Sequence, residues 1–155
     1  MNALAQLGMV SEIPSENQTR LEASLAHEGE ARKDYFVQRD GFTFAGMHLL
    51  VDLWGASNLD DSELIDSALR AAAVKAGATI LHSHFHTFTP NGGVSGVVVL
   101  AESHISIHTW PERGYAAVDI FMCGACDPHQ AVPVLRTAFQ PERVDVGEQR
   151  RGQVF

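Results

Sequence analysis

A block near the middle of the chain places imidazole and hydroxyl side chains at every second position. His104, Ser106 and His108 alternate with apolar residues, and because successive side chains of a β-strand point to opposite faces, we expect these three on one surface. Imidazole exchanges protons near neutral pH, and a hydroxyl beside such a base can act as a nucleophile. The same alternation is typical of a half-exposed strand whose polar residues face water. Spacing by itself leaves both interpretations open.

A second group of imidazoles comes earlier in the chain. His82, His84 and His86 share one face of a predicted strand, a spacing that could chelate a transition metal. A cupin-type site would add a carboxylate a few residues later, and the segment 87–92 contains none. We therefore favour polar residues lining one side of a sheet and expect no bound metal. A non-enzymatic metal-binding module built on these histidines remains the alternative of another class.

The two cysteines, Cys123 and Cys126, form a CxxC pair between a predicted strand and a predicted helix. Two cysteines are too few for a disulfide framework, and a reducing cytosol would keep both as thiols. The spacing occurs in redox pairs and in half-sites for zinc. Any function of this pair is therefore expected to be chemical.

Turn and cap signals divide the rest of the chain into short elements that would position these groups. Gly77 ends one helix, and Asp127-Pro128 followed by Gln130 is typical of a helix start, with a possible kink at Pro133. Because strands outnumber helices, the expected fold is α+β, a two-layer sandwich whose mainly antiparallel sheet is covered by two helices on one face. Strands are predicted at 47–54, 78–88, 94–101, 103–110, 115–123 and 144–146, and helices at 60–76 and 127–139.

Composition limits the class of protein. With 155 residues and 45% hydrophobic content the chain can form one core. Residues 1–40 lack sustained periodicity, which predicts a poorly ordered leader with a short helix at 20–26, before a domain at 41–155. A net charge of −8 disfavours a nucleic-acid partner. Neither a membrane span nor a secretory signal is found, so we expect a cytoplasmic protein.

The most informative block runs from Gly93 to Glu112 and reads Gly-Val-Ser-Gly-Val-Val-Val-Leu-Ala-Glu-Ser-His-Ile-Ser-Ile-His-Thr-Trp-Pro-Glu. It resembles the self-processing site of bacterial and archaeal S-adenosylmethionine decarboxylases, with the Gly-Val-Ser-Gly, Glu-Ser-His and Ile-His-Thr-Trp-Pro-Glu elements in order. The resemblance extends from His48-Leu-Leu-Val-Asp-Leu to Asp119-Ile-Phe-Met-Cys-Gly and leaves residues 1–40 uncovered.

The resemblance implies that Ser103 is the precursor of a pyruvoyl cofactor. Its hydroxyl would attack the Glu102 carbonyl and convert the amide to an ester; β-elimination and hydrolysis with loss of ammonia would then leave a pyruvoyl group. Ser95 and His108 are implied to assist, His108 as the proton acceptor. The chain would be a zymogen that cuts itself into chains 1–102 and 103–155.

Decarboxylation is implied by the same resemblance. The pyruvoyl group would form a Schiff base with the amine of S-adenosylmethionine and take up the electrons as carbon dioxide leaves. Cys123 matches the family's proton donor and Phe88 the aromatic residue that lies against the adenine, while Glu112 could contact the ribose or the cationic end of the substrate. Core packing of Phe88 and solvation of Glu112 are equally open. The product is the aminopropyl donor for spermidine in polyamine biosynthesis.

The resemblance also implies a dimer of cleaved protomers. Each active site would use Phe88, Ser95 and His108 of one protomer together with Ser103 and Cys123 of the other.

The chain departs from the family pattern at a few positions. Met47 stands where the family has an arginine, and Gly92-Gly93 adds a glycine. Because relatives with this machinery decarboxylate ornithine or arginine, a pyruvoyl-dependent ornithine or arginine decarboxylase is the alternative within the same chemistry.

Overall fold

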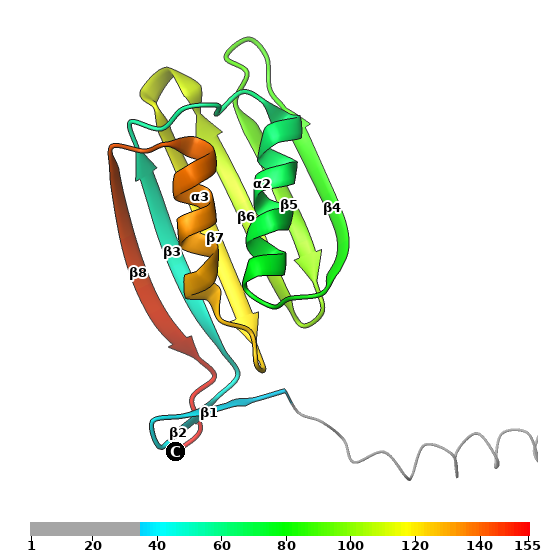
Figure 1. Ribbon diagram of the computed structural model, residues 1–155, viewed down its shortest axis with the longest axis vertical. Helices are drawn as coiled ribbons and strands as arrows, with labels where there is room; N and C mark the ends of the chain where they lie inside the picture. Colours follow the sequence, from blue (N-terminus) through cyan, green and yellow to red (C-terminus); the bar gives the residue numbers. More distant parts are fainter. Residues whose placement is uncertain (1–34) are drawn as a thin grey trace, which may run out of the picture. The chain divides into compact units, whose positions relative to one another are not determined.

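The computed structural model describes residues 35–155, and the short helix predicted at 20–26 lies outside these residues. A six-stranded sheet in the order β4-β5-β6-β7-β3-β8 forms one layer, and every neighbouring pair of strands is antiparallel. Two helices cover one face of it (Figure 1). The bounds are β3 (Gly46–Trp54), α2 (Ser62–Lys75), β4 (Ile80–Thr87), β5 (Val94–Leu100), β6 (Ser103–Trp110), η1 (Pro111–Arg113), β7 (Tyr115–Cys123), η2 (Pro128–Gln130), α3 (Ala131–Phe139) and β8 (Arg143–Arg151).

The core lies between the sheet and the two helices. Strand residues alternate between buried apolar and half-exposed side chains, so one face of the sheet is apolar. It packs against buried residues of α2 and α3, among them Leu69 and Leu135, neither of which is exposed to solvent. The fold is therefore the predicted α+β two-layer sandwich. The side chains that the sheet directs toward the helices include Leu49, Val51, Leu53, Ile105, Ile107, Val118 and Ile120.

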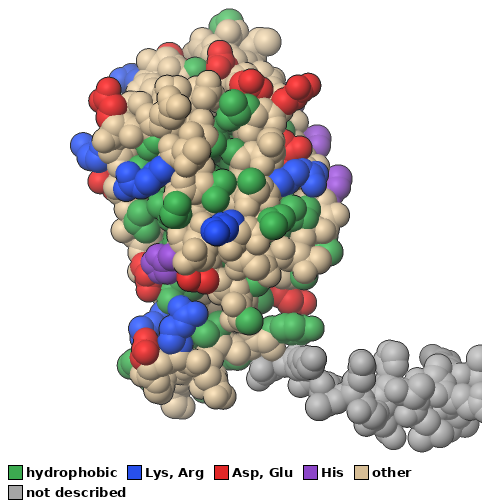
Figure 2. Space-filling view, viewed as in Figure 1, with side chains coloured by type: hydrophobic (Ala, Val, Ile, Leu, Met, Phe, Trp, Pro, Cys, Tyr) green, Lys and Arg blue, Asp and Glu red, His purple; other side chains and the backbone are tan. Residues whose placement is uncertain are grey.

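The other face of the sheet, called the open face below, carries no helix among the described residues (Figure 1). It is made of the alternate positions of the same strands. The helix side of the molecule carries acidic and basic side chains interspersed over its surface (Figure 2), as expected of a surface in water. Within residues 35–155, no helix is long and apolar enough to cross a membrane.

The final strand is longer than predicted. β8 spans Arg143–Arg151 and pairs with β3 along its whole length, whereas the sequence indicated only 144–146. β8 is an edge strand with mostly exposed side chains, so it has no apolar alternation by which it could be recognised. Its place in the sheet comes from backbone pairing with β3.

A small hairpin of β1 (Val37–Arg39) and β2 (Phe42–Phe44) was not predicted, and β1 falls within the range assigned to the leader. These strands are only three residues long, too short for periodicity to reveal. Pro133 lies in the first turn of α3, where its missing N–H has no partner to lose. The proline is therefore compatible with the start of this helix.

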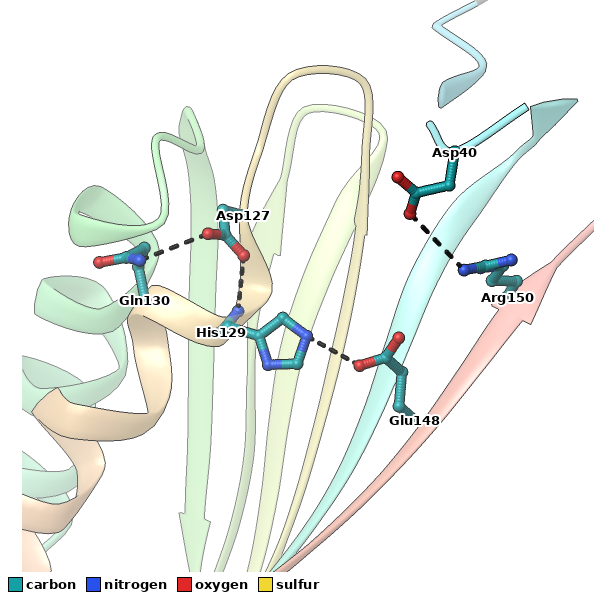
Figure 3. Close-up of polar contacts among 6 residues, drawn as sticks. All are labelled: Asp40, Asp127, His129, Gln130, Glu148 and Arg150. Atoms are coloured by element: carbon teal, nitrogen blue, oxygen red, sulfur yellow. Dashed lines mark hydrogen bonds and ion pairs between the residues drawn. The ribbon is translucent and has the colours of Figure 1, made fainter. Parts of the chain in front are cut away.

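Side-chain contacts hold the start of α3 against β8 (Figure 3). The Asp127 carboxylate accepts hydrogen bonds from the His129 backbone N–H at 3.1 Å and from the Gln130 amide at 3.3 Å. Asp127 thus caps the 3-10 helix η2, and α3 begins at Ala131, later than the predicted start at 127. His129 Nε2 lies 2.8 Å from a Glu148 carboxylate oxygen on β8. These contacts connect the second helix to the edge strand of the sheet.

Candidate active site

The β5–β6 hairpin turns through two residues, Ala101 and Glu102, because Leu100 and Ser103 are paired across it. Glu102 has a φ of +57°, in the left-handed region. For a residue with a Cβ, this left-handed conformation costs about 1–2 kcal/mol relative to the right-handed one. The carbonyl that precedes Ser103 therefore belongs to a strained residue.

Ser103, Glu102 and Cys123 meet at this end of the sheet. Ser103 is 8% exposed, and its Oγ accepts a hydrogen bond from the Cys123 backbone N–H at 3.2 Å. The Cys123 thiol lies 3.6 Å from the same Oγ and donates to the Glu102 carbonyl oxygen at 3.1 Å. A nucleophilic hydroxyl thus lies beside a strained carbonyl that a thiol polarises.

An open pocket of about 520 Å³ adjoins these residues, within the range of small-molecule sites. Three rings form part of its wall: the centroids of His48 and Phe121 are 6.1 Å apart, and those of His104 and Phe121 are 5.9 Å apart. Burial, and secondarily the nearby His48, lowers the pKa of His104, so this ring is neutral near pH 7. The pocket is lined by Ala45, His48, Glu102, Ser103, His104, Phe121, Arg151 and Gly152.

A chain of polar side chains crosses the open face at this pocket. His48 Nε2 is 3.1 Å from Asp119 Oδ1, and His48 Nδ1 is 3.3 Å from a guanidinium nitrogen of Arg151. Sequence reasoning gave none of these three a role. His48 is 71 residues from Asp119 and 103 from Arg151, so no local spacing could have indicated the contact.

Ser95 and His108 form a second polar pair at a different place on the open face. Ser95 Oγ lies 2.8 Å from His108 Nδ1, and the two residues are register partners on β5 and β6. His108 is five positions beyond Ser103 on β6, which at about 3.3 Å per residue is roughly 16 Å along the strand. Within one protomer the structure therefore separates this pair from the Ser103 group.

The two predicted substrate residues also lie away from Ser103. Phe88 follows β4, is 50% exposed and contacts the His86 ring with centroids 4.6 Å apart. Glu112 is exposed in η1. Phe88 is thus not a core residue in this protomer.

The histidines of β4 form no metal centre with their surroundings. His82, His84 and His86 are all exposed on this edge strand. In the part of the chain that the structure describes, no three His, Cys, Asp or Glu side chains are arranged to hold a metal ion. The geometry therefore gives the metal-binding alternative no support.

The second cysteine is turned away from the Ser103 group. The Cys126 thiol donates to the Gly77 carbonyl at 3.4 Å, and both cysteines are free. Burial, with a smaller contribution from Cys123, raises the pKa of Cys126 and keeps it a neutral thiol.

Comparisons with a family model, with curated proteins and with solved structures all match the same family. The family model described as S-adenosylmethionine decarboxylase matches residues 47–152. The chain is 46% identical over 110 residues to the S-adenosylmethionine decarboxylase proenzyme of Thermomicrobium roseum, covering 70% of this chain and 95% of that protein. It is 48% identical over 111 residues to the proenzyme of Thermotoga maritima, covering 70% and 85%. The crystal structure of adenosylmethionine decarboxylase from Aquifex aeolicus superposes with a TM-score of 0.65 at 41% identity, covering 72% of this chain and 94% of that one.

Proposed function

Because the chain belongs to the S-adenosylmethionine decarboxylase family, we propose that it is a proenzyme that cleaves itself between Glu102 and Ser103 and then decarboxylates S-adenosylmethionine. The observation that carries this proposal is the meeting of Ser103, the strained Glu102 carbonyl and the Cys123 thiol. The product would supply aminopropyl groups for spermidine. As a carboxy-lyase it would release carbon dioxide from the α-carbon of the amino acid.

Cleavage begins when Ser103 Oγ attacks the Glu102 carbonyl carbon. The C–O bond forms, the C–N bond breaks, and the hydroxyl proton passes to the Ser103 nitrogen, so the amide becomes an ester. The Cys123 thiol, which donates to the Glu102 oxygen, stabilises the negative charge that builds on it. Opening the turn also removes the strain at Glu102, which favours the forward step.

Elimination follows when a base removes the proton from Cα of residue 103 and the Glu102 carboxylate leaves Cβ. Water then replaces the nitrogen as ammonia, which leaves a pyruvoyl group at the start of chain 103–155 and a free carboxylate at Glu102. We assign the base to His108, whose Nδ1 is hydrogen-bonded to Ser95. The hydroxyl of Ser95 orients this imidazole.

The surroundings of Ser103 fit a pyruvoyl group. When present, the group supplies a carbonyl that condenses with the substrate amine and takes up the electrons of the bond to carbon dioxide. The Cys123 N–H, which donates to Ser103 Oγ, would hold it at the edge of the pocket. The Cys123 thiol would return a proton to the substrate α-carbon.

We also propose that the enzyme works as a dimer in which two open faces pack together. Large apolar side chains are uncovered on this face: Leu50 is 49% exposed and Trp110 is 42% exposed. Association with a second copy would remove this apolar surface from water. It would also bring the partner's His108 to the pocket that Ser103 lines. Within one protomer, the separation of roughly 16 Å along β6 keeps His108 away from Ser103.

The substrate is tested by carbon dioxide release from carboxyl-labelled compounds. We expect the purified, cleaved enzyme to release label from S-adenosylmethionine and to leave ornithine and arginine intact, because the pocket wall carries aromatic rings suited to a sulfonium and an adenine. Release from ornithine or arginine alone would instead favour the alternative within the same chemistry. A cleaved protein that acts on none of the three would contradict the proposed activity.

Subunit sharing is tested with two variants that are defective in different parts of the site. Ser103→Ala and His108→Ala should each remain uncut alone. When they are co-expressed with different tags, mixed dimers unite Ser103 of one chain with His108 of the other, so the His108→Ala chain should be cleaved. The measurement is intact mass of each tagged chain. Failure to cleave in isolated mixed dimers would place both residues in the same protomer's site.

A further inference from the structure

Arg151 brings a positive charge to the pocket, whose described lining also includes Glu102. Among residues 35–155 it is the only Lys or Arg that lines the pocket, in a chain of net charge −8. The other arginines of β8 are paired: Arg143 with Asp145 at 3.1 Å and Arg150 with Asp40 at 4.0 Å. Among residues 35–155, Arg151 forms no ion pair with Asp or Glu. A positive charge held in a small-molecule pocket is suited to an anionic group of a ligand.

His48 fixes the direction of this guanidinium. A guanidinium only donates, so His48 Nδ1, 3.3 Å away, must be the acceptor. The ring proton therefore sits on Nε2, which donates to Asp119 Oδ1 at 3.1 Å. Since one donor of Arg151 binds His48, the remaining N–H groups are available to a planar, bidentate acceptor such as a carboxylate.

The sheet register places Arg151 in the same row across the strands as Cys123, the proposed proton donor. Gly46 pairs with Arg151 on one side and with Cys123 on the other. Strands lie about 4.8 Å apart, so the Cα atoms of Arg151 and Cys123 are roughly 10 Å apart, a distance that an arginine side chain largely spans. No side chain intervenes at Gly46, where a Cβ would lie 2.6 Å from the Met122 carbonyl and 2.8 Å from the Phe121 ring.

We propose that Arg151 binds the α-carboxylate of the amino-acid substrate, with His48 and Asp119 as positioning residues. The inference rests on the proposed function, in which Cys123 gives a proton to the same α-carbon that has lost this carboxylate as carbon dioxide. The carboxylate must then lie close to the Cys123 thiol, in the row that ends at Arg151. Holding it fixes the direction of the bond that breaks.

The test separates carboxylate recognition from general binding. In Arg151→Gln, KM for S-adenosylmethionine should rise about 10–100-fold, because a charged hydrogen-bonded pair is lost. Decarboxylated S-adenosylmethionine lacks the carboxylate, so its calorimetric Kd should stay within about twofold of wild type. Arg150→Gln is the matched control: its guanidinium stacks over the Phe42 ring at 4.8 Å, and all values should be unchanged.

The positioning role is tested by non-additivity. His48→Phe should raise KM more than it lowers kcat in the wild-type background, and should have no further effect on KM in Arg151→Gln, because it acts through Arg151. Asp119→Asn keeps an acceptor for His48 and should preserve most of the affinity. Equal, additive effects of His48→Phe in both backgrounds would contradict the positioning role.

Three results would overturn the assignment of Arg151. One is an unchanged KM in Arg151→Gln, and another is an equal loss of affinity for substrate and product. The third is slower self-cleavage, measured by intact mass, together with a normal KM of the fraction that is cleaved. That result would mean that Arg151 binds the carboxylate formed at Glu102, the new chain end, and not the substrate carboxylate. A wild-type protein that neither cleaves nor releases carbon dioxide would instead overturn the proposed function and this inference with it.

Discussion

Ser103→Ala is expected to remain a single chain of 155 residues and to release no carbon dioxide from S-adenosylmethionine, while the wild type separates into chains 1–102 and 103–155. In the proposed mechanism this hydroxyl is both the attacking group and the source of the cofactor, so its loss should remove cleavage and decarboxylation together. Intact mass spectrometry of freshly purified protein measures the first effect. The wild-type second chain should also resist amino-terminal sequencing, because a pyruvoyl group has no free amine.

The control for this variant is Ser67→Ala, at an exposed position on α2. It should be cleaved at the wild-type rate, since its side chain contacts none of the site. The Ser103→Ala protein should keep its fold, because Ala fits a position whose side chain is almost buried. An uncut wild type, or cleavage of Ser103→Ala at the same bond, would contradict the mechanism.

Cys123→Ala is expected to weaken two steps by different amounts. Decarboxylation should fall by about 10²–10⁴-fold, the usual contribution of a positioned general acid. Cleavage should also slow, because the thiol that donates to the Glu102 carbonyl at 3.1 Å is lost; removing one donor of this kind typically costs 10²–10³-fold in rate. The backbone N–H that binds Ser103 Oγ is retained, so slow cleavage should persist.

Two further variants separate these roles. Cys123→Ser keeps a hydroxyl donor near the Glu102 carbonyl and should restore much of the cleavage rate, but it is a weaker acid than a thiol and should restore little decarboxylation. Cys126→Ala should behave as wild type, because its thiol is directed to the Gly77 carbonyl. The measurements are the time course of intact mass after synthesis and kcat of the cleaved fraction. Normal kcat in cleaved Cys123→Ala would assign the proton to another group.

Most of the fold could be predicted because its elements carry local signals. β3, β6 and β7 alternate apolar and polar residues, and the predicted ranges 47–54, 103–110 and 115–123 match these strands to within a residue. Asp61 caps α2 through the Leu64 N–H, and Gly77 follows that helix with a φ of +84°. β8 had no such signal, since the edge of a sheet requires backbone pairing and not an apolar face.

The site could be predicted only in part. The proposed cleavage bond, Glu102-Ser103, and the proposed proton donor, Cys123, came from two short motifs that resemble a family, and they stay predictions. The contact of Cys123 with Glu102 and Ser103 joins two hairpins and depends on how β6 pairs with β7. Alternation alone placed His104 and His108 on one face, and the structure confirms this, but alternation does not specify which neighbour each of them meets.

By itself, the sequence determined the fold class, the family and the bond at which cleavage is proposed, because periodicity, caps and motifs are properties of short segments. Only the tertiary structure decided that Arg151, His48 and Asp119 form one chain of contacts, and that Ser95 lies against His108. Those relations depend on strand order and register. Both arise from long-range backbone pairing and from packing of the sheet on its helices, which no local pattern encodes.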